Sequence, residues 1–237
     1  MRRSVGILIS VLVMACAAEK PAVRDSTTTK PVARPDTTAR RKILFVGTSL
    51  TAGLGLDPDS AFSYLIQRKI DSAGLPFETV NAGVSGETTA GLLERLDWLL
   101  RGEFDVIVIE TGANDGLRAI DATAIRHNLD EVVKRVKAAK PAALVVLVQM
   151  EALPNYGRDY GSVFHDLYPE VAQRERVTLA PFLLAGVAGH RDLNQSDGVH
   201  PNLEGERIVA ENLWRALRPL LQRRVEASRV DQRTKSP

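Results

Sequence analysis

Four short polar stretches of this sequence each contain a group suited to acyl transfer. Ser49 lies in "GTSLTAG", directly after a short apolar run, and His200 follows Asp197 by three residues in "SDGVHPN". Acyl transfer by a serine needs a neutral base and a carboxylate that orients this base, so Ser49, His200 and Asp197 could form such a set. The reaction also needs hydrogen-bond donors for the oxyanion. The backbone N–H of Gly83 and the side-chain amide of Asn114 could supply them.

Each of these residues also has a simpler explanation when it is taken alone. Ser49 could cap a helix, His200 could be a structural turn residue, and Gly83 could serve a turn that needs positive φ. Asn114 begins Asn-Asp-Gly, which is a common turn sequence. The glycines around Ser49 could bind an anion, although the GxxxxGK[ST] lysine and the GxGxxG pattern are both missing from the sequence. A single catalytic site therefore requires a fold that brings the four stretches together.

Apolar runs alternate with helical patterns between residues 42 and 221. Continuous apolar runs predict strands at residues 42–46, 77–81, 104–110, 142–150 and 177–179. Apolar residues at helical spacing predict helices over residues 61–73, 88–100, 121–139, 163–174 and 203–221. Strands that are apolar throughout and separated by helices indicate a parallel sheet covered on both faces, which is a three-layer α/β/α domain. Ligand sites in such sheets lie beyond the carboxyl ends of the strands, and Ser49 is expected there.

Four blocks in this order resemble the SGNH (GDSL-type) hydrolases, which are named for Ser, Gly, Asn and His. The resemblance covers nearly all of residues 42–221 and looks closest to the bacterial thioesterase I, lysophospholipase and arylesterase branch. The blocks that carry it are "NAGVSGETTAGLLERL", "ETGANDGLR", "QMEALPNYGRDY" and "DGVHPNLEGERIVAENLW". The four family residues would be Ser49, Gly83, Asn114 and His200, with Asp197 completing Asp-x-x-His.

The resemblance implies a flavodoxin-like, mostly parallel sheet and a Ser-His-Asp mechanism that uses neither a metal nor another cofactor. It implies an oxyanion hole made by the N–H groups of Ser49 and Gly83 and by Asn114. By the same resemblance, a further set of residues is expected to contact the substrate: Thr48, Leu117, Arg118, Leu153 and Tyr156.

One position departs from the family pattern. The Gly-Asp-Ser of the family is Gly47-Thr48-Ser49 in this chain. The Asp before the nucleophile is not the acid of the triad in this family, so the triad is complete here. Thr48 can still hold the loop through its hydroxyl, but it brings no charge.

The charge distribution argues against a nucleic-acid enzyme. Residues 42–221 contain 18 basic and 24 acidic residues, a net charge of −6, while the basic excess lies in residues 1–41 and 222–237. A nucleic-acid enzyme would usually carry a basic face on its folded domain. Cys16 is the one cysteine in the sequence, and the four histidines lack metal-ligand spacing, so neither a disulfide nor a metal site is expected.

The two ends of the chain look different from its body. Residues 1–16 combine two arginines, a short apolar run and "VMAC", which resembles a bacterial lipobox and predicts export and lipidation of Cys16. An ordinary cleaved signal peptide and an uncleaved anchor are the alternatives. Residues 17–41 are rich in Pro, Thr and charge and predict a disordered tether, and residues 222–237 predict a flexible tail.

We therefore expect a bacterial serine esterase, exported and tethered to a membrane through Cys16, that hydrolyses small acyl esters or thioesters. A carbohydrate O-deacetylase that uses the same site is the alternative. A non-catalytic binding lipoprotein is a third hypothesis, which the complete set of Ser49, Asp197 and His200 argues against.

Overall fold

The computed structural model describes the backbone of residues 40–235 and the side chains of residues 40–230, so the expected leader, Cys16 and residues 17–39 lie outside the described part. Five strands form one sheet in which every neighbouring pair is parallel. Their order across the sheet is β2-β1-β3-β4-β5. The strands are β1 (Arg41–Gly47), β2 (Phe77–Gly83), β3 (Val106–Ile109), β4 (Leu144–Val148) and β5 (Thr178–Ala180).

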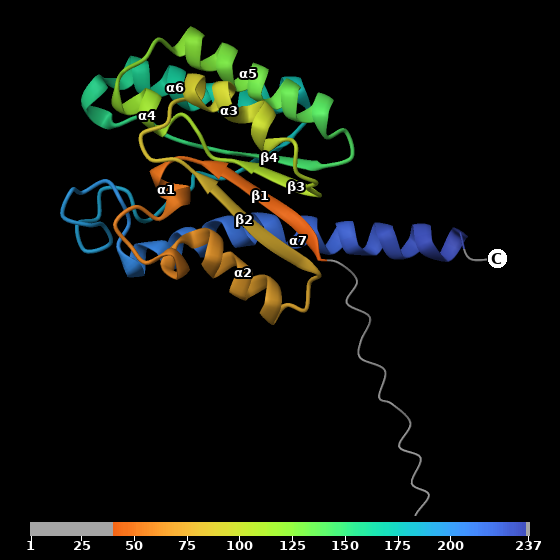
Figure 1. Cartoon of the computed structure of the whole chain (residues 1–237). Helices are drawn as coiled ribbons and strands as arrows, with labels where there is room; N and C mark the ends of the chain where they lie inside the picture. Colours follow the sequence, from red (N-terminus) through yellow and green to blue (C-terminus); the bar gives the residue numbers. More distant parts are fainter. Residues whose placement is uncertain (1–39, 236–237) are drawn as a thin grey trace, which may run out of the picture. The chain divides into compact units, whose positions relative to one another are not determined.

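Helices cover both faces of this sheet. Figure 1 shows α3, α5 and α6 on one side and α2 and α7 on the other, which gives the three layers predicted from the sequence. The helices are α1 (Ser49–Ala52), α2 (Phe62–Ser72), α3 (Thr89–Leu99), α4 (Ala113–Leu117), α5 (Ala122–Ala139), α6 (Arg158–Glu175) and α7 (Leu203–Lys235), with 3₁₀ turns η1 (Pro58–Ser60) and η2 (Pro154–Tyr156). None of the helices within the described residues has both the length and the apolar character needed to cross a bilayer.

The strand order determines where a site can form. The order 2-1-3-4-5 is the flavodoxin-like arrangement, in which the chain reverses its direction of progress across the sheet between β1 and β3. Loops diverge at this switch point and leave a crevice at the carboxyl ends of the two strands. Ser49 begins α1 directly after β1, and α4 follows β3, so both lie at the crevice.

Apolar sequence and local capping account for these elements. All four residues of β3 are buried, which explains why the run reads as continuously apolar. The Thr88 side chain caps α3 by accepting a hydrogen bond from the Gly91 N–H. The Asp121 side chain caps α5 by accepting hydrogen bonds from the N–H groups of Thr123 and Ala124.

The closing helix is longer than predicted: α7 continues past Leu221 to Lys235, through most of the segment expected to be a flexible tail over residues 222–237. The segment contains good helix formers and no glycine, and proline returns only at Pro237. Tertiary contacts hold its first part: Arg41 donates to the Arg224 carbonyl, and the Arg224 side chain donates to the Ala142 carbonyl. A charged and weakly apolar sequence can thus be helical where the helix before it continues and tertiary contacts hold its first turns.

Several other boundaries differ from prediction by one or more residues, and hydrogen bonds account for two of them. β1 begins at Arg41, the last residue of the expected tether, because the Arg41 N–H donates to the Pro76 carbonyl before β2. α6 begins at Arg158, five residues before the predicted start, although its first turn is polar. The Tyr160 hydroxyl donates to the Ile120 carbonyl and fixes this turn against the loop before α5.

Candidate active site

Ser49, His200 and Asp197 lie within hydrogen-bond distance of one another. His200 Nε2 is 2.8 Å from Ser49 Oγ, and His200 Nδ1 is 2.7 Å from Asp197 Oδ2. Ser49 is the first residue of α1, while the other two residues lie in the loop before α7. This is the nucleophile–base–acid geometry required of a serine hydrolase, in which the carboxylate orients the imidazole.

Asp197 is held in its ionised form by its own loop. The backbone N–H groups of His200 and Val199 donate to Asp197 Oδ1 at 3.0 and 2.9 Å. These two bonds, followed by the one from the His200 side chain, lower the pKa of Asp197 to about 2. A charged carboxylate therefore faces His200 Nδ1 at neutral pH, which favours the tautomer that leaves Nε2 free to accept the serine proton.

A buried carboxylate holds the loop that carries Ser49. Glu110 ends the apolar run of β3, and it accepts hydrogen bonds from the Thr48 N–H at 2.8 Å and from Thr51 Oγ1 at 2.9 Å. Thr48 Oγ1 lies 3.0 and 3.1 Å from the two oxygens of Glu110. Burial raises the pKa of Glu110, and the bonds from Thr48 and Thr51 oppose this rise. Glu110 was missed in the sequence, although a carboxylate directly after an apolar strand, at the same sheet edge as Ser49, was a usable signal.

The prediction that Gly83 supplies an oxyanion donor is contradicted by the structure. β2 continues to Gly83, whose N–H donates to Asn81 Oδ1 at 2.9 Å. A Cβ atom on Gly83 would lie 2.3 Å from the backbone nitrogen of Ala52, so glycine here permits the close approach of β2 to α1. Gly83 does not line the cavity at Ser49 and lies instead along a groove between β2 and α3.

Gly86, three residues later, occupies the position expected of the donor. It lines the cavity together with Ser49, Asn114 and His200. Its φ of +77° is a conformation that favours glycine. Within the part of the chain that the structure describes, the Gly86 N–H has no hydrogen-bond acceptor.

Asn114 lies beside this loop, as the sequence suggested. Its Nδ2 donates to the Glu87 carbonyl at 3.0 Å, which leaves the second amide hydrogen for another acceptor. Buried Asp115 accepts from the N–H of Thr89 at 2.9 Å and from its hydroxyl at 2.6 Å. These bonds tie α4 to the start of α3 and so fix Asn114 relative to the Gly86 loop.

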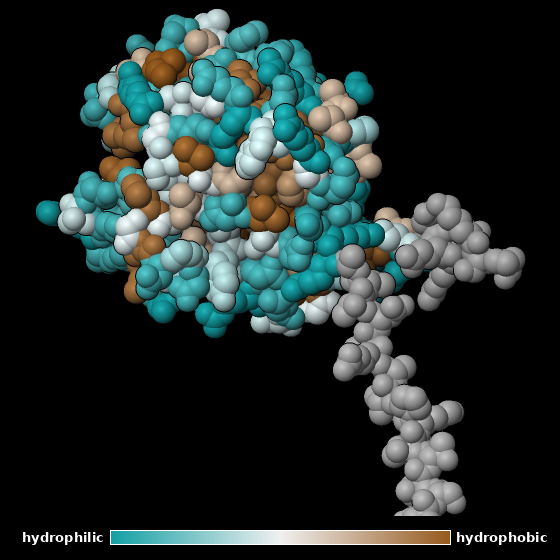
Figure 2. Space-filling view, in the orientation of Figure 1, coloured by the Kyte–Doolittle hydropathy of each residue, from teal (hydrophilic) through white to brown (hydrophobic). Residues whose placement is uncertain are grey.

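These groups surround a cavity of about 590 Å³. Figure 2 shows hydrophobic residues gathered on the left of the molecule, where Figure 1 draws α1 and α4. Most of the side chains around the cavity are apolar, among them Leu50, Leu54, Leu117, Met150, Leu153, Phe182 and Leu184. Such walls suit the hydrocarbon part of an acyl ester.

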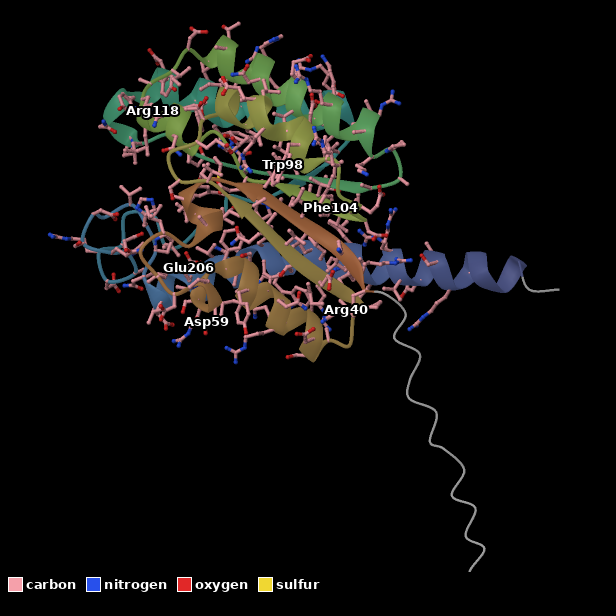
Figure 3. The ribbon with its side chains drawn as sticks, in the orientation of Figure 1. Arg40, Asp59, Trp98, Phe104, Arg118 and Glu206 are labelled. Atoms are coloured by element: carbon pink, nitrogen blue, oxygen red, sulfur yellow. The ribbon has the colours of Figure 1, made fainter. Side chains whose placement is uncertain are left out.

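The residues expected to contact the substrate divide into two groups. Leu117 and Leu153 line the cavity. Thr48 is fully buried and contacts Glu110 instead, so its assignment to substrate binding is wrong. Arg118 and Tyr156 do not line the cavity. Arg118, labelled in Figure 3, donates to the Gly86 carbonyl. The Tyr156 hydroxyl donates to the Leu117 carbonyl. Both hold residues that do line it.

Among the described side chains, residues 40–230, no group of three or more His, Cys, Asp or Glu is arranged to bind a metal ion.

Comparison with known proteins gives a consistent result. The model of the GDSL-like Lipase/Acylhydrolase family matches residues 45–208. Esterase TesA of Pseudomonas aeruginosa is 39% identical over 184 residues, which are 77% of this chain and 90% of that protein. Thioesterase 1/protease 1/lysophospholipase L1 of Escherichia coli is 33% identical over 180 residues, 76% of this chain and 84% of that protein.

A solved structure agrees with the sequence relatives. The esterase EstA from Pseudoalteromonas sp., in a structure inhibited by monoethylphosphonate, superposes with a TM-score of 0.73 at 33% identity. The match covers 77% of this chain and 99% of that one.

Proposed function

Because the chain belongs to the GDSL-like lipase/acylhydrolase family and is a serine hydrolase acting on ester bonds, we propose that it forms an acyl-enzyme on Ser49. The observation that carries the proposal is the continuous arrangement of Ser49 Oγ, His200 and Asp197, with separations of 2.8 and 2.7 Å. His200 Nε2 accepts the serine proton as Oγ attacks the acyl carbonyl carbon. Asp197 stabilises the imidazolium that results.

The two half-reactions use the same groups. When the tetrahedral intermediate collapses, its bond to the leaving alcohol or thiol breaks, and His200 gives that group its proton. Water then attacks the acyl-enzyme, His200 takes a proton from this water, and the carboxylic acid leaves as the proton returns to Ser49. In both steps, we assign oxyanion stabilisation to the N–H groups of Ser49 and Gly86 and to the free amide hydrogen of Asn114.

The substrate class is supported by the cavity and by the relatives. Apolar walls around about 590 Å³ suit a short or medium acyl chain better than an acetylated sugar, which would need polar partners for its hydroxyls. Esters, thioesters and lysophospholipids, which the names of the relatives suggest, are the candidates.

The test combines trapping with turnover. A fluorophosphonate should label Ser49, as located by peptide mass spectrometry, and p-nitrophenyl butyrate should be hydrolysed. Ser49→Ala should lose both properties, while Ser60→Ala, at a half-buried serine that does not line the cavity, should keep them. Asn114→Ala should lower turnover by about 10²–10³ with a smaller change in KM, the usual cost of losing one oxyanion donor. Near-normal turnover by Ser49→Ala would refute the acyl-enzyme.

We also propose that the chain is exported from a bacterial cell and anchored through lipid on Cys16, on the basis of the apolar run that ends in "VMAC". This arrangement leaves the cavity accessible. β1 runs from Arg41 towards Ser49, so the chain enters the sheet at the amino end of β1, and the cavity lies at the carboxyl end of the same strand. Mass spectrometry of the protein from its native host should find a lipidated N-terminal Cys16, and Cys16→Ser should abolish it. A mature chain that begins after residue 16 without lipid would contradict the anchor.

A further inference from the structure

One wall of the catalytic cavity carries an ionisable side chain that the mechanism does not use. Glu151 follows β4 and lines the cavity together with Ser49 and His200. It also lines an adjoining hollow formed by the start of α6, which includes His165 and Asp166. The side chain of Glu151 is 30% exposed, so solvent also reaches it.

The partners of Glu151 leave its charge in place. Glu151 Oε1 lies 2.7 Å from His165 Nδ1 and 3.4 Å from Gln149 Nε2. Gln149 Nε2 also donates to the His165 carbonyl at 3.0 Å, which connects all three residues. Within the described residues, no lysine or arginine forms an ion pair with Glu151. The contact with His165 Nδ1 orients the Glu151 carboxylate.

Among the residues that the structure describes, no lysine or arginine side chain lines the same cavity to offset this charge. Its ionisable lining residues are Glu151 and His200, and ionised Asp197 stands behind His200. Two arginines lie outside its lining: Arg118, whose guanidinium donates to the Gly86 carbonyl, and Arg158, which lines the adjoining hollow with Glu151 but forms no ion pair with it.

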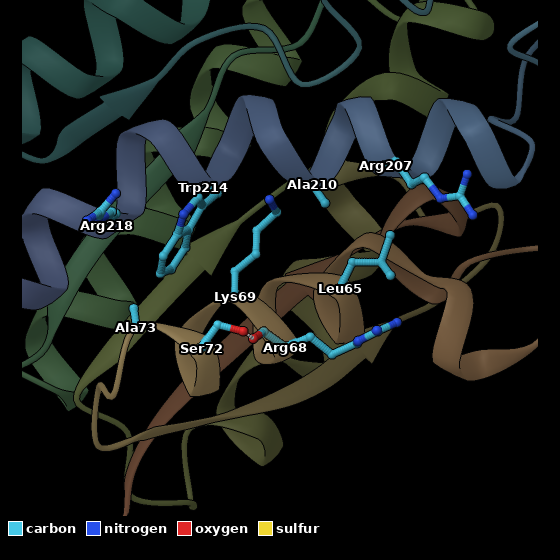
Figure 4. Close-up of a pocket in the computed structure, with 9 residues that line it drawn as sticks. All are labelled: Leu65, Arg68, Lys69, Ser72, Ala73, Arg207, Ala210, Trp214 and Arg218. Carbon is cyan, nitrogen blue, oxygen red and sulfur yellow. Dashed lines mark hydrogen bonds between the residues drawn. The ribbon is translucent and has the colours of Figure 1, made fainter.

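A cluster of cations does exist, but elsewhere on the molecule. Figure 4 shows Arg68, Lys69, Arg207 and Arg218 around a hollow between α2 and α7. That hollow shares no lining residue with the catalytic cavity. An anionic group on a substrate whose ester lies at Ser49 therefore meets the field of Glu151 rather than these cations.

We infer that Glu151, oriented by His165, forms an anionic subsite that makes this enzyme select neutral and cationic esters over anionic ones. The inference rests on the proposed function, because it assigns a substrate class to the same site. Thioesters of anionic carriers would then be poor substrates, and esters that bear a quaternary ammonium group would be good ones. Attraction at a partly exposed carboxylate is moderate and salt-dependent, so we expect a preference of about two- to tenfold in kcat/KM at low ionic strength.

Pairs of a cationic ester and its uncharged isostere would test this inference, with one anionic ester added to each series. For the leaving group, butyrylthiocholine is compared with S-(3,3-dimethylbutyl) thiobutyrate, its uncharged isostere, and with butyryl-CoA as the anion. For the acyl group, the p-nitrophenyl esters of 4-(trimethylammonio)butyrate, 5,5-dimethylhexanoate and glutarate serve the same purpose. Assays at pH 8 keep ordinary imidazole groups neutral.

In at least one series, the wild type should prefer the cation over its neutral isostere by about two- to tenfold, mainly through KM, and the preference should shrink in 0.5 M salt. Glu151→Gln should bring the ratio close to one, and Glu151→Lys should invert it. Asp166→Asn is the matched control, because Asp166 lines the adjoining hollow and not the catalytic cavity, so its ratio should equal that of the wild type.

The two proposals fail in different ways. If neutral esters are hydrolysed and Ser49 is labelled, but Glu151→Gln leaves the charge ratios unchanged in both series, the anionic subsite is wrong and the acyl-enzyme stands. If the wild type hydrolyses no ester and Ser49 is not labelled, both proposals are wrong.

Discussion

Replacing Thr48 by valine tests how the nucleophile loop is held. Thr48 is fully buried, and its hydroxyl lies 3.0 and 3.1 Å from the two carboxylate oxygens of Glu110. The same hydroxyl accepts a weak bond from the Leu50 N–H at 3.4 Å. Valine keeps the shape of the side chain and removes only the hydroxyl. The bond from the Thr48 N–H to Glu110 survives, as does the bond from Thr51.

The magnitude follows from these contacts. A hydrogen bond to a buried charged group contributes about 1.5–3 kcal/mol, and the long cap to Leu50 adds about 0.5 kcal/mol at most. We therefore expect Thr48→Val to lower the free energy of unfolding by about 2–3 kcal/mol. Turnover should fall only about tenfold, which is roughly 1.4 kcal/mol of barrier, because the loop that positions Ser49 loosens while the triad stays complete.

Urea unfolding and the kcat for p-nitrophenyl butyrate measure the two effects. Thr48→Ser keeps the hydroxyl and should stay near wild type in both. Thr51→Val removes the other hydroxyl donor to Glu110, and the double variant reports the coupling between the two threonines. A loss of turnover as large as that of Ser49→Ala would give Thr48 a chemical role and refute this reasoning. Wild-type stability of Thr48→Val would show that the bond to Glu110 stabilises nothing.

Two further predictions concern residues away from the triad. Glu206, labelled in Figure 3, lies between α7 and α2, and burial raises its pKa to about 8. The folded state therefore holds the Glu206 proton more tightly than the unfolded state does. For this reason, the free energy of unfolding should fall as pH rises from about 5 through 8. In the wild type, this loss of unfolding free energy between pH 5 and 8 should be on the order of 3–4 kcal/mol, measured by urea unfolding at several pH values. Glu206→Gln should remove the loss, and an unchanged pH dependence would contradict the assignment. Gly83→Ala should lower the free energy of unfolding by about 1–3 kcal/mol, because its Cβ would meet the Ala52 nitrogen at 2.3 Å. Wild-type thermal stability of that variant would argue against the close approach of β2 and α1.

The triad could be predicted because its determinants are local. Ser49 directly follows an apolar strand, and Asp197 and His200 share one turn in which the carboxylate accepts two backbone N–H groups. A parallel sheet then brings strand ends to one edge whatever the lengths of the helices between them. Sequence pattern and sheet topology therefore suffice to place these three residues together.

The choice between Gly83 and Gly86 could not be made in this way. It depends on which glycine keeps a free N–H, and that depends on how far β2 extends and on the side chain of Asn81, which occupies the Gly83 N–H. Both glycines lie in the same block of sequence, so composition and spacing do not distinguish them. The extension of α7 escaped prediction for a similar reason, since the contact between Arg41 and Arg224 joins residues 183 positions apart.

The surroundings of Glu110 show how a threonine at position 48, where the family pattern has Asp, holds this loop. An aspartate at this position would place a second carboxyl within about 3 Å of a buried one, and two such groups cannot both be ionised at low cost. Thr48 offers a hydroxyl to the same carboxylate and avoids the repulsion, so the loop is held without a second acid. The acid that orients His200 is Asp197, whose side chain is 47% exposed and whose pKa of about 2 keeps it charged. The carboxylates of Glu110 and Asp197 thus serve different purposes. Glu110 is buried among hydroxyl donors and holds the loop, whereas Asp197 is solvated, bonded to backbone N–H groups and orients His200. Because the acid of the triad is Asp197, a threonine at position 48 leaves the chemistry of Ser49 possible.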